Sequence, residues 1–510
     1  MQRDPLPGDP RPVGQTGAAD ALALARIAAK NSPLAVVTAT ARDAQRLLEE
    51  VSWFAPALRL CLLPDWETLP YDAFSPHQDL VSERLATLYR LQRGEFDLAI
   101  VPAQTALVRL CPPAYLAART FFLQQGDRLD AAALRAQLAT AGYQHVTQVV
   151  APGEFCIRGG LIDLFPTGSQ VPYRLDLDDD RIEAIRTFDV DTQRTLYPVK
   201  EIRMLPAREF PLDEPGRVKF RSRWRETFEG DPSKKGVYRD VSAGIAAGGV
   251  EYYLPLFFDE AATLFDYLPA NTAWARLGDV PAAVDAFWRE ASSRYRLMGG
   301  DPDRPLLPPE RVFVPAEEFH VAARALHRVA AESLLETAAL PPLAVERRAQ
   351  DPLAGLKRFL AGSGLRVMVA AESPGRRETM LAYFAEYGLA PEVVADFDAW
   401  SSGGVRFGLA VAPLGEGFAL PAEGWCVVTE AELYAGTVRR RARGARKESS
   451  VEGMLRDLSE LRIGDPVVHA QHGIGRYHGL VGLDLGEGPT EFLHLQYEGG
   501  DKLYVPVSQL

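Results

Sequence analysis

The chain has little of what a membrane or secreted protein needs. No apolar run in its 510 residues approaches the ~20 residues that a membrane-spanning helix requires. The first fifteen residues also lack the apolar core of a secretory signal. The four cysteines lie far apart without CxxC spacing, which favours neither a zinc knuckle nor a disulfide framework. We therefore expect a cytoplasmic protein.

Positive charge is also scarce. There are 56 Lys and Arg against 68 Asp and Glu, a net charge of −12, which argues against a protein whose whole surface coats nucleic acid. One basic run stands out, RRRARGARK at 439–447. A charged run containing Gly and Ala is more often a solvated linker than a DNA site, so we predict a linker at 437–458 and keep weak DNA contact as the alternative.

What is present is the alternation of helices and apolar strands typical of α/β domains, and the length suggests roughly three to four of them. In 1–115, continuous apolar strands predict a parallel sheet buried on both faces. The predicted elements are a helix at 19–30, a strand at 34–39, a helix at 41–51, and strands at 58–64 and 97–103. Residues 206–335 return to α/β and complete this lobe.

The segment 116–205 is therefore predicted to be an inserted small α+β domain, with a helix at 131–142. A second small α/β domain is expected at 336–436, with a strand at 365–373 and a helix at 374–387. Residues 459–510 contain short strands separated by Gly-rich turns, which predicts an SH3- or Tudor-like β-barrel.

The most informative stretch is QVVAPGEFCIRGGLIDLFPTGSQVPYRLDLD, residues 148–178. Apolar and polar residues alternate in three short strands, and Gly159-Gly160 supplies a tight turn because glycine takes positive φ without cost. The alternation places Arg158 and Arg174 on the polar side. Outward arginines on a small sheet favour a protein-binding surface, and the alternative is that both only solvate an exposed sheet.

These residues also carry a family resemblance. GEFCIRGGLIDLFP and PYRLDLDDDRIEAIRTFDVDTQRT resemble the UvrA-binding domain of UvrB and, more closely, the UvrB-like half of bacterial transcription-repair coupling factors, the Mfd family. The resemblance extends through LPDWETLPYDAFSPHQDLVSERLATLYRL, GGVEYYLPLFF and LFDYLPAN. It implies that Arg158 and Arg174 contact UvrA. A large aromatic that often follows the third strand is replaced here around Leu177 and Asp178.

The resemblance also implies a degenerate helicase-type ATPase in the first lobe. The expected phosphate loop reads GQTGAAD, residues 14–20, with Gly14, Thr16 and Gly17 kept but Ala19-Asp20 in place of the Lys-Ser/Thr pair. Aspartate there would repel phosphate. The acidic motif of UvrB is replaced by 277–280, LGDV, and the UvrB lesion-probing hairpin has no room. We expect no catalytic residues, no metal and no bound ATP or Mg in this chain.

The last segment, with LRIGDPVVHAQHGIGRYHGL and DKLYVPVSQL, resembles the RNA-polymerase-interacting domain of the same family, which is related to CarD-type regulators. From 460 to 510 there are three Lys/Arg and seven Asp/Glu, a net charge of −4, which favours a protein partner over nucleic acid. The resemblance implies the β subunit of RNA polymerase, bound by edge-strand pairing at 474–483. The candidate contacts are Arg476, Tyr477, His478 and Leu483, although Tyr477 and Leu483 could instead fill the barrel core.

The sequence thus predicts a non-catalytic, monomeric scaffold that links stalled RNA polymerase to UvrA. In the family an ATP-driven translocase on double-stranded DNA follows the barrel, and we expect it to lie beyond Leu510. Two alternatives stay open: a diverged UvrB-like ATPase and a stand-alone CarD-type transcription regulator.

Overall fold

The structure, a computed structural model, describes residues 18–30, 33–329, 335–346, 348–434, 466–469, 473–484, 489–496 and 502–506. The chain divides into two compact units, 1–434 and 435–510. None of the helices in these described segments is long and apolar enough to cross a membrane.

The first lobe is built on a five-stranded sheet in the order β13-β12-β1-β3-β2, in which every neighbouring pair is parallel. Every residue of β1 and β3 is buried, so the predicted parallel sheet covered on both faces is confirmed. The strands are β1 (Leu34–Thr38), β2 (Leu60–Leu62), β3 (Leu98–Pro102), β12 (Ala273–Leu277) and β13 (His327–Arg328).

The helices of the first part of this lobe follow the apolar pattern of the sequence. They are α1 (Ala19–Lys30), α2 (Ala41–Phe54), α3 (Gln78–Arg93), α4 (Ala103–Ala106) and α5 (Pro113–Ala118). The bounds of α1 are those predicted. The helix α2 continues beyond the predicted end at Val51, because Leu47, Val51 and Phe54 lie on one face and are all buried.

The chain leaves this sheet after β3 and returns to it at β12, which pairs with β1. Between them, β4 (Phe121–Gln124) and β11 (Glu201–Met204) pair antiparallel, so the entry and exit of the inserted domain lie side by side. This arrangement supports the prediction that the small sheet domain is an insertion. The remaining elements of the lobe are α7 (Glu214–Thr227), η1 (Pro232–Lys234), α8 (Gly236–Ser242), η2 (Val250–Leu256), η3 (Leu264–Tyr267), α9 (Val280–Met298), α10 (Pro309–Val312) and α11 (Ala316–Ala325).

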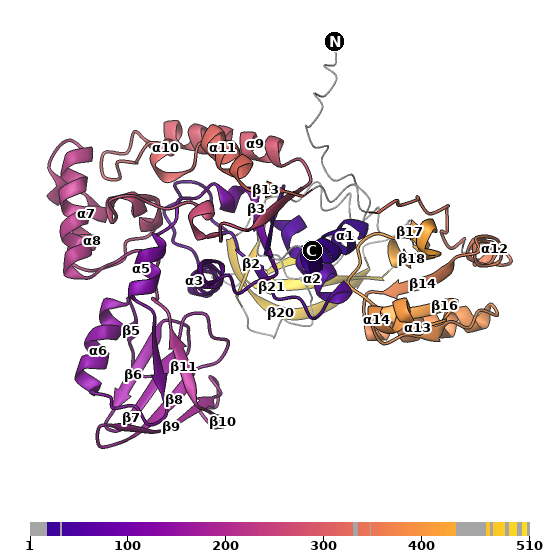
Figure 1. The fold of residues 1–510 in the computed structure, drawn as a ribbon, viewed down its shortest axis with the longest axis horizontal. Helices are drawn as coiled ribbons and strands as arrows, with labels where there is room; N and C mark the ends of the chain where they lie inside the picture. The colour runs from indigo at the N-terminus through magenta and orange to yellow at the C-terminus, as the bar shows by residue number, and fades with distance from the viewer. Residues whose placement is uncertain are drawn as a thin grey trace, which may run out of the picture. The chain divides into compact units, whose positions relative to one another are not determined.

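The inserted domain is a six-stranded sheet in the order β10-β9-β8-β7-β6-β5, with α6 (Ala131–Thr140) packed on one face (Figure 1). Leu134 and Leu138 of α6 join Phe155, Ile162 and Leu175 in the main core of this domain. The strands are β5 (Gln144–His145), β6 (Glu154–Arg158), β7 (Leu161–Phe165), β8 (Tyr173–Asp178), β9 (Arg181–Phe188) and β10 (Thr195–Val199). The three predicted strands and the turn at Gly159, φ 61°, are confirmed.

The small α/β domain has a sheet in the order β15-β16-β14-β18-β17, in which only β17 runs antiparallel. Its elements are α12 (Ala354–Gly362), β14 (Arg366–Ala371), α13 (Pro374–Glu386), β15 (Glu392–Val393), α14 (Phe397–Ser402), β16 (Phe407–Val411), β17 (Phe418–Leu420), η5 (Pro421–Glu423), β18 (Trp425–Thr429) and α15 (Glu430–Leu433). The predicted strand and helix at its centre are confirmed.

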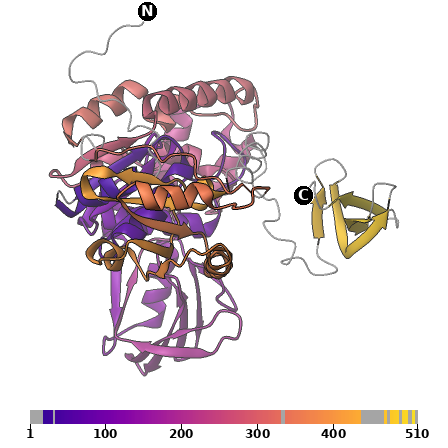
Figure 2. The ribbon, with the colours of Figure 1, turned by 90° about the vertical axis from the view of Figure 1, so that its right-hand side faces the viewer.

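The described residues of the second unit form four antiparallel strands in the order β19-β20-β21-β22, seen as one curved sheet in Figure 2. They are β19 (Pro466–His469), β20 (Gly473–Asp484), β21 (Pro489–Gln496) and β22 (Lys502–Pro506). Their closure into a barrel stays a prediction. The predicted linker at 437–458 lies outside the described residues.

Candidate functional site

The inserted sheet has two different faces. One packs on α6 and is apolar. The other carries the pairs Cys156 with Asp163 and Asp163 with Arg174 on neighbouring strands, because directly opposite residues of an antiparallel sheet share a face. Val149, Phe165 and Phe188 form a small apolar cluster with Cys156 on this second face. The candidate site is built on this second face, which we call the arginine face.

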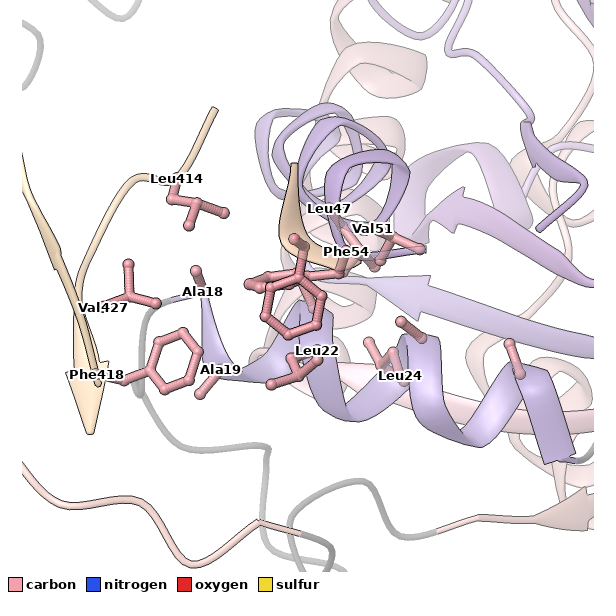
Figure 3. Packing of buried hydrophobic residues seen from close by; sticks show 14 of the residues in the cluster. Ala18, Ala19, Leu22, Leu24, Leu47, Val51, Phe54, Leu414, Phe418 and Val427 are labelled. Carbon is pink, nitrogen blue, oxygen red and sulfur yellow. The ribbon is translucent and has the colours of Figure 1, made fainter. Parts of the chain in front are cut away.

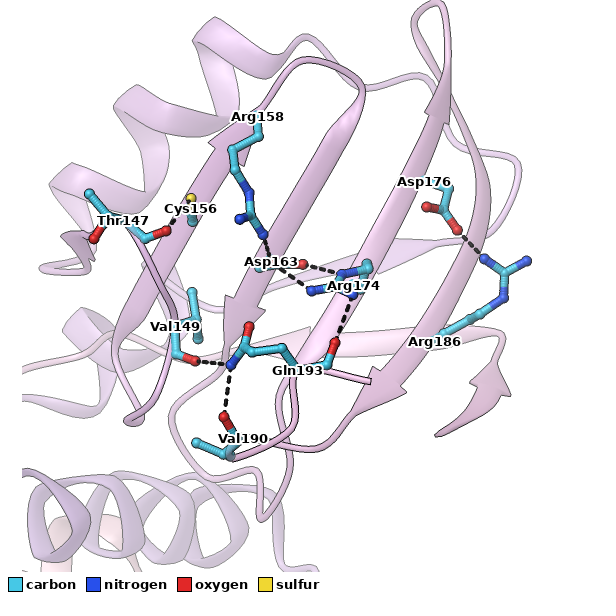
Figure 4. A network of polar contacts seen from close by, with 10 residues as sticks. All are labelled: Thr147, Val149, Cys156, Arg158, Asp163, Arg174, Asp176, Arg186, Val190 and Gln193. Carbon is cyan, nitrogen blue, oxygen red and sulfur yellow. Dashed lines mark hydrogen bonds and ion pairs between the residues drawn. The ribbon is translucent and has the colours of Figure 1, made fainter. Parts of the chain in front are cut away.

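A buried carboxylate lies at the centre of the arginine face. The side chain of Asp163 is 1 % exposed and accepts hydrogen bonds from both predicted arginines (Figure 4). Arg158 Nη2 donates to Oδ2 at 2.6 Å, while Arg174 donates from Nε to Oδ1 at 2.7 Å and from Nη2 to Oδ2 at 3.0 Å. Two cations thus compensate one desolvated anion, which is the condition for a buried charge to be tolerated.

The two arginines differ in exposure. Arg158 is 52 % exposed, whereas the side chain of Arg174 is 16 % exposed. Arg174 also donates from Nη1 to the carbonyl of Gln193 and lies over the ring of Phe188, 4.8 Å from its centroid. The hydrogen bonds to Asp163 raise the pKa of Arg174. Both arginines lie on the polar face, as the alternation predicts, but only Arg158 is substantially exposed, because Asp163, Gln193 and Phe188 hold Arg174 against the sheet.

Sequence reasoning missed Asp163 and Gln193. Asp163 sits on the polar side of the predicted second strand, and a lone acid among LIDLF was a signal that an arginine partner lay nearby. Gln193 has φ 57° in the turn after β9 and donates from Nε2 to the carbonyls of Val149 and Val190. It therefore ties the segment before β6 to the turn that holds Arg174, and no local pattern indicated this.

The positions that replace the family aromatic are only partly available to a partner. A bulge between Asp176 and Leu177 shifts the register of β8 against β9. After it, Leu177 is half-buried and packs against the core under α6, while Asp178 is exposed. Of these two candidate contacts, Asp178 is the more accessible.

The described residues that follow the expected phosphate loop pack against the small α/β domain. Residues 14–17, including Gly14, Thr16 and Gly17, lie outside the described residues. The next residues are buried: Ala18, Ala19 and Asp20 are 0 %, 2 % and 7 % exposed. The amide of Ala18 donates to the carbonyl of Glu416 at 3.3 Å. Figure 3 shows Leu414, Phe418 and Val427 opposite the start of α1, and all belong to one cluster.

Asp279, the acid in the segment 277–280, has a structural role. Asp279 caps α9, because its Oδ1 accepts a hydrogen bond from the amide of Ala282 at 3.1 Å. Gly278 has φ 75° and approaches Ala39 so closely that a Cβ there would lie 3.0 Å from the Ala39 side chain. Asp279 and Gly278 thus form the start of α9.

The predicted polymerase contacts lie on β20. Arg476 and His478 are exposed, but Tyr477 is 6 % exposed and belongs to the interior of this sheet with Leu493 and Leu495. This burial favours the alternative that Tyr477 fills the core, because alternate residues of a strand face opposite sides. Its contact with the polymerase stays a prediction. Leu483 pairs with Thr490, and its side chain lies outside the described residues.

The predicted strand donor is also only partly correct. β20 pairs with β19 through its first four residues and with β21 from Arg476 onward, so it lies inside the sheet. Its second half pairs with β21 on one side, and no described strand pairs with it on the other side. Edge pairing by β20 therefore remains a prediction for that half.

No group of three or more His, Cys, Asp or Glu in the described part of the chain could hold a metal ion. The rings of His478 and His494 lie 5.4 Å apart. Burial, followed by nearby positive charge, lowers the pKa of His494. His472 lies outside the described residues.

Three family models match parts of the chain. The family model of the UvrB interaction domain matches residues 121–210, the inserted sheet domain. The D3 domain of MFD matches 359–433, and the CarD-like/TRCF RID domain matches 461–510. The chain is thus a multidomain α/β protein that combines a UvrB-type interaction domain with a CarD-type module.

Curated relatives give the particular family. The chain is 41% identical to a transcription-repair-coupling factor of Haemophilus influenzae over 96% of this chain and 44% of the relative. For the Escherichia coli protein of the same name the identity is 40%, over 99% and 45%. For that of Bacillus subtilis it is 26%, over 94% and 42%. Together the matches support assigning the chain to part of a transcription-repair coupling factor, and it spans less than half the length of these relatives.

Proposed function

We propose that this chain is the docking part of a coupling factor between transcription and repair. The inserted sheet domain binds UvrA, and the C-terminal strands bind the β subunit of RNA polymerase. The ATP-driven motor on double-stranded DNA belongs to the rest of the protein, since the chain spans 44% of its Haemophilus influenzae relative. This proposal includes the domain bounds predicted from the sequence. They are 1–115 with 206–335 for the first lobe, 116–205 for the inserted domain, 336–436 for the small α/β domain and 459–510 for the C-terminal strands.

The arginine face carries the proposal for UvrA. It holds two arginines on one buried carboxylate, and it lies within the segment that matches the UvrB interaction domain. Arginines in a fixed arrangement are well suited to protein recognition, because the planar guanidinium binds a carboxylate through two parallel hydrogen bonds. Exposed Arg158 makes the direct contact in this proposal, with Arg174 and Asp178 beside it.

For RNA polymerase, the proposal rests on the match of 461–510 to the CarD-like/TRCF RID domain and on the net charge of −4 in this segment. Exposed Arg476 and His478 are the proposed contacts, together with Leu483.

We further propose that the first lobe binds neither ATP nor Mg and catalyses no reaction. The closed start of α1 supports this, because Ala18 and Ala19 are buried against the small α/β domain where a phosphate would need open backbone amides. A micromolar, Mg²⁺-dependent ATP affinity of this chain, measured by calorimetry, would restore the alternative of a diverged ATPase.

A capture experiment tests the docking proposal. Immobilised UvrA should retain the wild-type chain and lose affinity at least ~100-fold for Arg158→Glu, because an acid replaces the exposed cation. Arg135→Glu is the matched control, since Arg135 lies exposed on α6, on the opposite side of the sheet. Equal capture of all three chains, or of none, would contradict UvrA docking and favour the stand-alone CarD-type regulator.

A further inference from the structure

The carboxylate that the sequence did not single out has a role of its own in the docking face. We propose that buried Asp163 is a positioning residue for UvrA binding: it fixes the exposed Arg158 in the orientation that receives a carboxylate of the partner. This inference rests on the proposed UvrA-docking function and deepens it. In this proposal the main role of Arg174 is to hold the carboxylate of Asp163 in place.

Arg174 has most of its hydrogen-bonding capacity engaged inside the domain. Its Nε and Nη2 donate to the two oxygens of Asp163, and its Nη1 donates to the carbonyl of Gln193. One face of its guanidinium is covered by the ring of Phe188. A group held on three sides has little freedom to follow a partner, so its main effect is to keep the carboxylate of Asp163 in place.

Arg158 is placed differently. It uses one of its five N–H donors on Asp163, at 2.6 Å, and half of its side chain is exposed. The donors that point away from Asp163 form the fork that suits a planar oxyanion. The partner class that fits is therefore a protein surface presenting an Asp or Glu side chain.

Fixing an arginine before binding matters because a long, flexible side chain loses rotational freedom when it is captured. A hydrogen bond to an immobile, buried carboxylate removes part of that cost in advance. Asp163 itself cannot move outward, since it is 1 % exposed and its neighbours Cys156 and Arg174 flank it across the sheet. The carboxylate of Asp163 thus holds Arg158 in place and does not compete with a carboxylate of the partner for the outward donors of Arg158.

Simple charge attraction predicts the opposite result on mutation. Asp163→Asn removes a negative charge beside two arginines, so attraction alone would strengthen binding to an acidic partner and speed association. The positioning role predicts weaker binding in spite of the added positive charge. The amide oxygen of Asn can still accept one hydrogen bond, which favours retention of the fold.

The experiment is surface-based kinetics of the whole 510-residue chain on immobilised UvrA. For Asp163→Asn we expect the dissociation rate to rise roughly tenfold while the association rate is unchanged or higher, since loss of preorganisation acts mainly on dissociation. Asp180→Asn is the matched control: it removes the same charge from the same domain, at an exposed pair with Arg128. It should leave the dissociation rate within twofold of wild type.

The readout separates positioning from folding. If Asp163→Asn only unfolds part of the chains, the binding amplitude falls but the dissociation rate of the remaining complexes stays as in wild type, and this would overturn the proposal. A dissociation rate equal to that of Asp180→Asn would overturn it as well. Asp163→Glu, which keeps the charge but lengthens the side chain, should also dissociate faster.

Failure of this inference is distinguishable from failure of the docking proposal. If wild type binds UvrA and Arg158→Glu does not, docking stands whatever Asp163→Asn does. If wild type itself shows no binding to UvrA, both ideas fail.

Discussion

The arginine face of the inserted sheet and the junction between α1 and the small α/β domain are held together by different forces. On the arginine face, charged side chains converge on Asp163 and one arginine stays half exposed. At the junction, side chains from α1, α2 and the small domain form one apolar cluster in which Phe54, Phe397, Phe418 and Trp425 meet edge to face. Polar contacts also cross it: Trp53 Nε1 donates to the carbonyl of Val411, and the buried carboxylate of Glu50 accepts a hydrogen bond from the amide of Gly415.

The difference separates a junction that stabilises the lobe from a face that keeps exposed hydrogen-bond donors. An apolar junction excludes water, so it stabilises the lobe and buries the start of α1. A charged face with a half-exposed arginine keeps binding capacity, because its donors are oriented but not all used. Apolar packing and exposed hydrogen-bond donors are therefore concentrated in different parts of the chain.

The largest effect should follow from opening the junction. Phe418→Ala removes a ring that is 2 % exposed and should lower the free energy of unfolding by about 3–5 kcal/mol. UvrA affinity should stay unchanged at temperatures where the variant is folded. Differential scanning calorimetry and UvrA kinetics check the two parts. Phe74→Ala is the control, because Phe74 is 73% exposed and its loss should cost little.

An intermediate effect should come from Glu251, a carboxyl of the lobe that lacks the two-arginine support of Asp163. Its Oε2 accepts a hydrogen bond from the Ser75 hydroxyl at 2.8 Å, and burial raises the pKa of Glu251 to about 7. The folded chain therefore holds a proton that the unfolded chain loses near its ordinary pKa of 4.5. Stability should fall as pH rises through the window from 4.5 to 7 and stay lower above it.

Glu251→Gln should remove this loss, because an amide does not titrate. Relative to wild type, the variant should gain stability between pH 5 and pH 8, by on the order of 3 kcal/mol at most. Thermal unfolding at both pH values checks the sign. If the stability of Glu251→Gln relative to wild type decreased as the pH rises, Glu251 would not be neutral in the folded chain.

The smallest effect should come from the rim of the junction. Arg26 and Glu423 pair at 2.5 Å, with their side chains 38% and 34% exposed. Because solvent screens such a pair, Arg26→Ala should cost no more than about 1 kcal/mol. Thermal unfolding at low and high salt would measure it. A loss as large as that of Phe418→Ala would mean that charge, rather than apolar packing, holds the junction.

Much of the fold could be predicted because its signals are local. Period and apolar content placed α1 and the strands β1, β2 and β3 of the first sheet, and Gly159-Gly160 marked the turn that brings β6 and β7 together. The same alternation assigned Arg158 and Arg174 to the polar side. Strand ends and the extension of α2 to Phe54 were less predictable, since burial against distant residues decides where an element stops.

The sequence by itself determined the α/β class, the inserted sheet and the presence of two arginines on one face, because these depend on short-range pattern. The tertiary structure alone decided that Arg174 is drawn in while Arg158 stays out. It also decided that Tyr477 is buried and that the small α/β domain covers the start of α1. These outcomes depend on which side chains from distant segments meet, as Asp163, Gln193 and Phe188 do around one guanidinium. Strand register and packing between domains determine these contacts, and neither leaves a periodic pattern in the sequence from which it could be predicted.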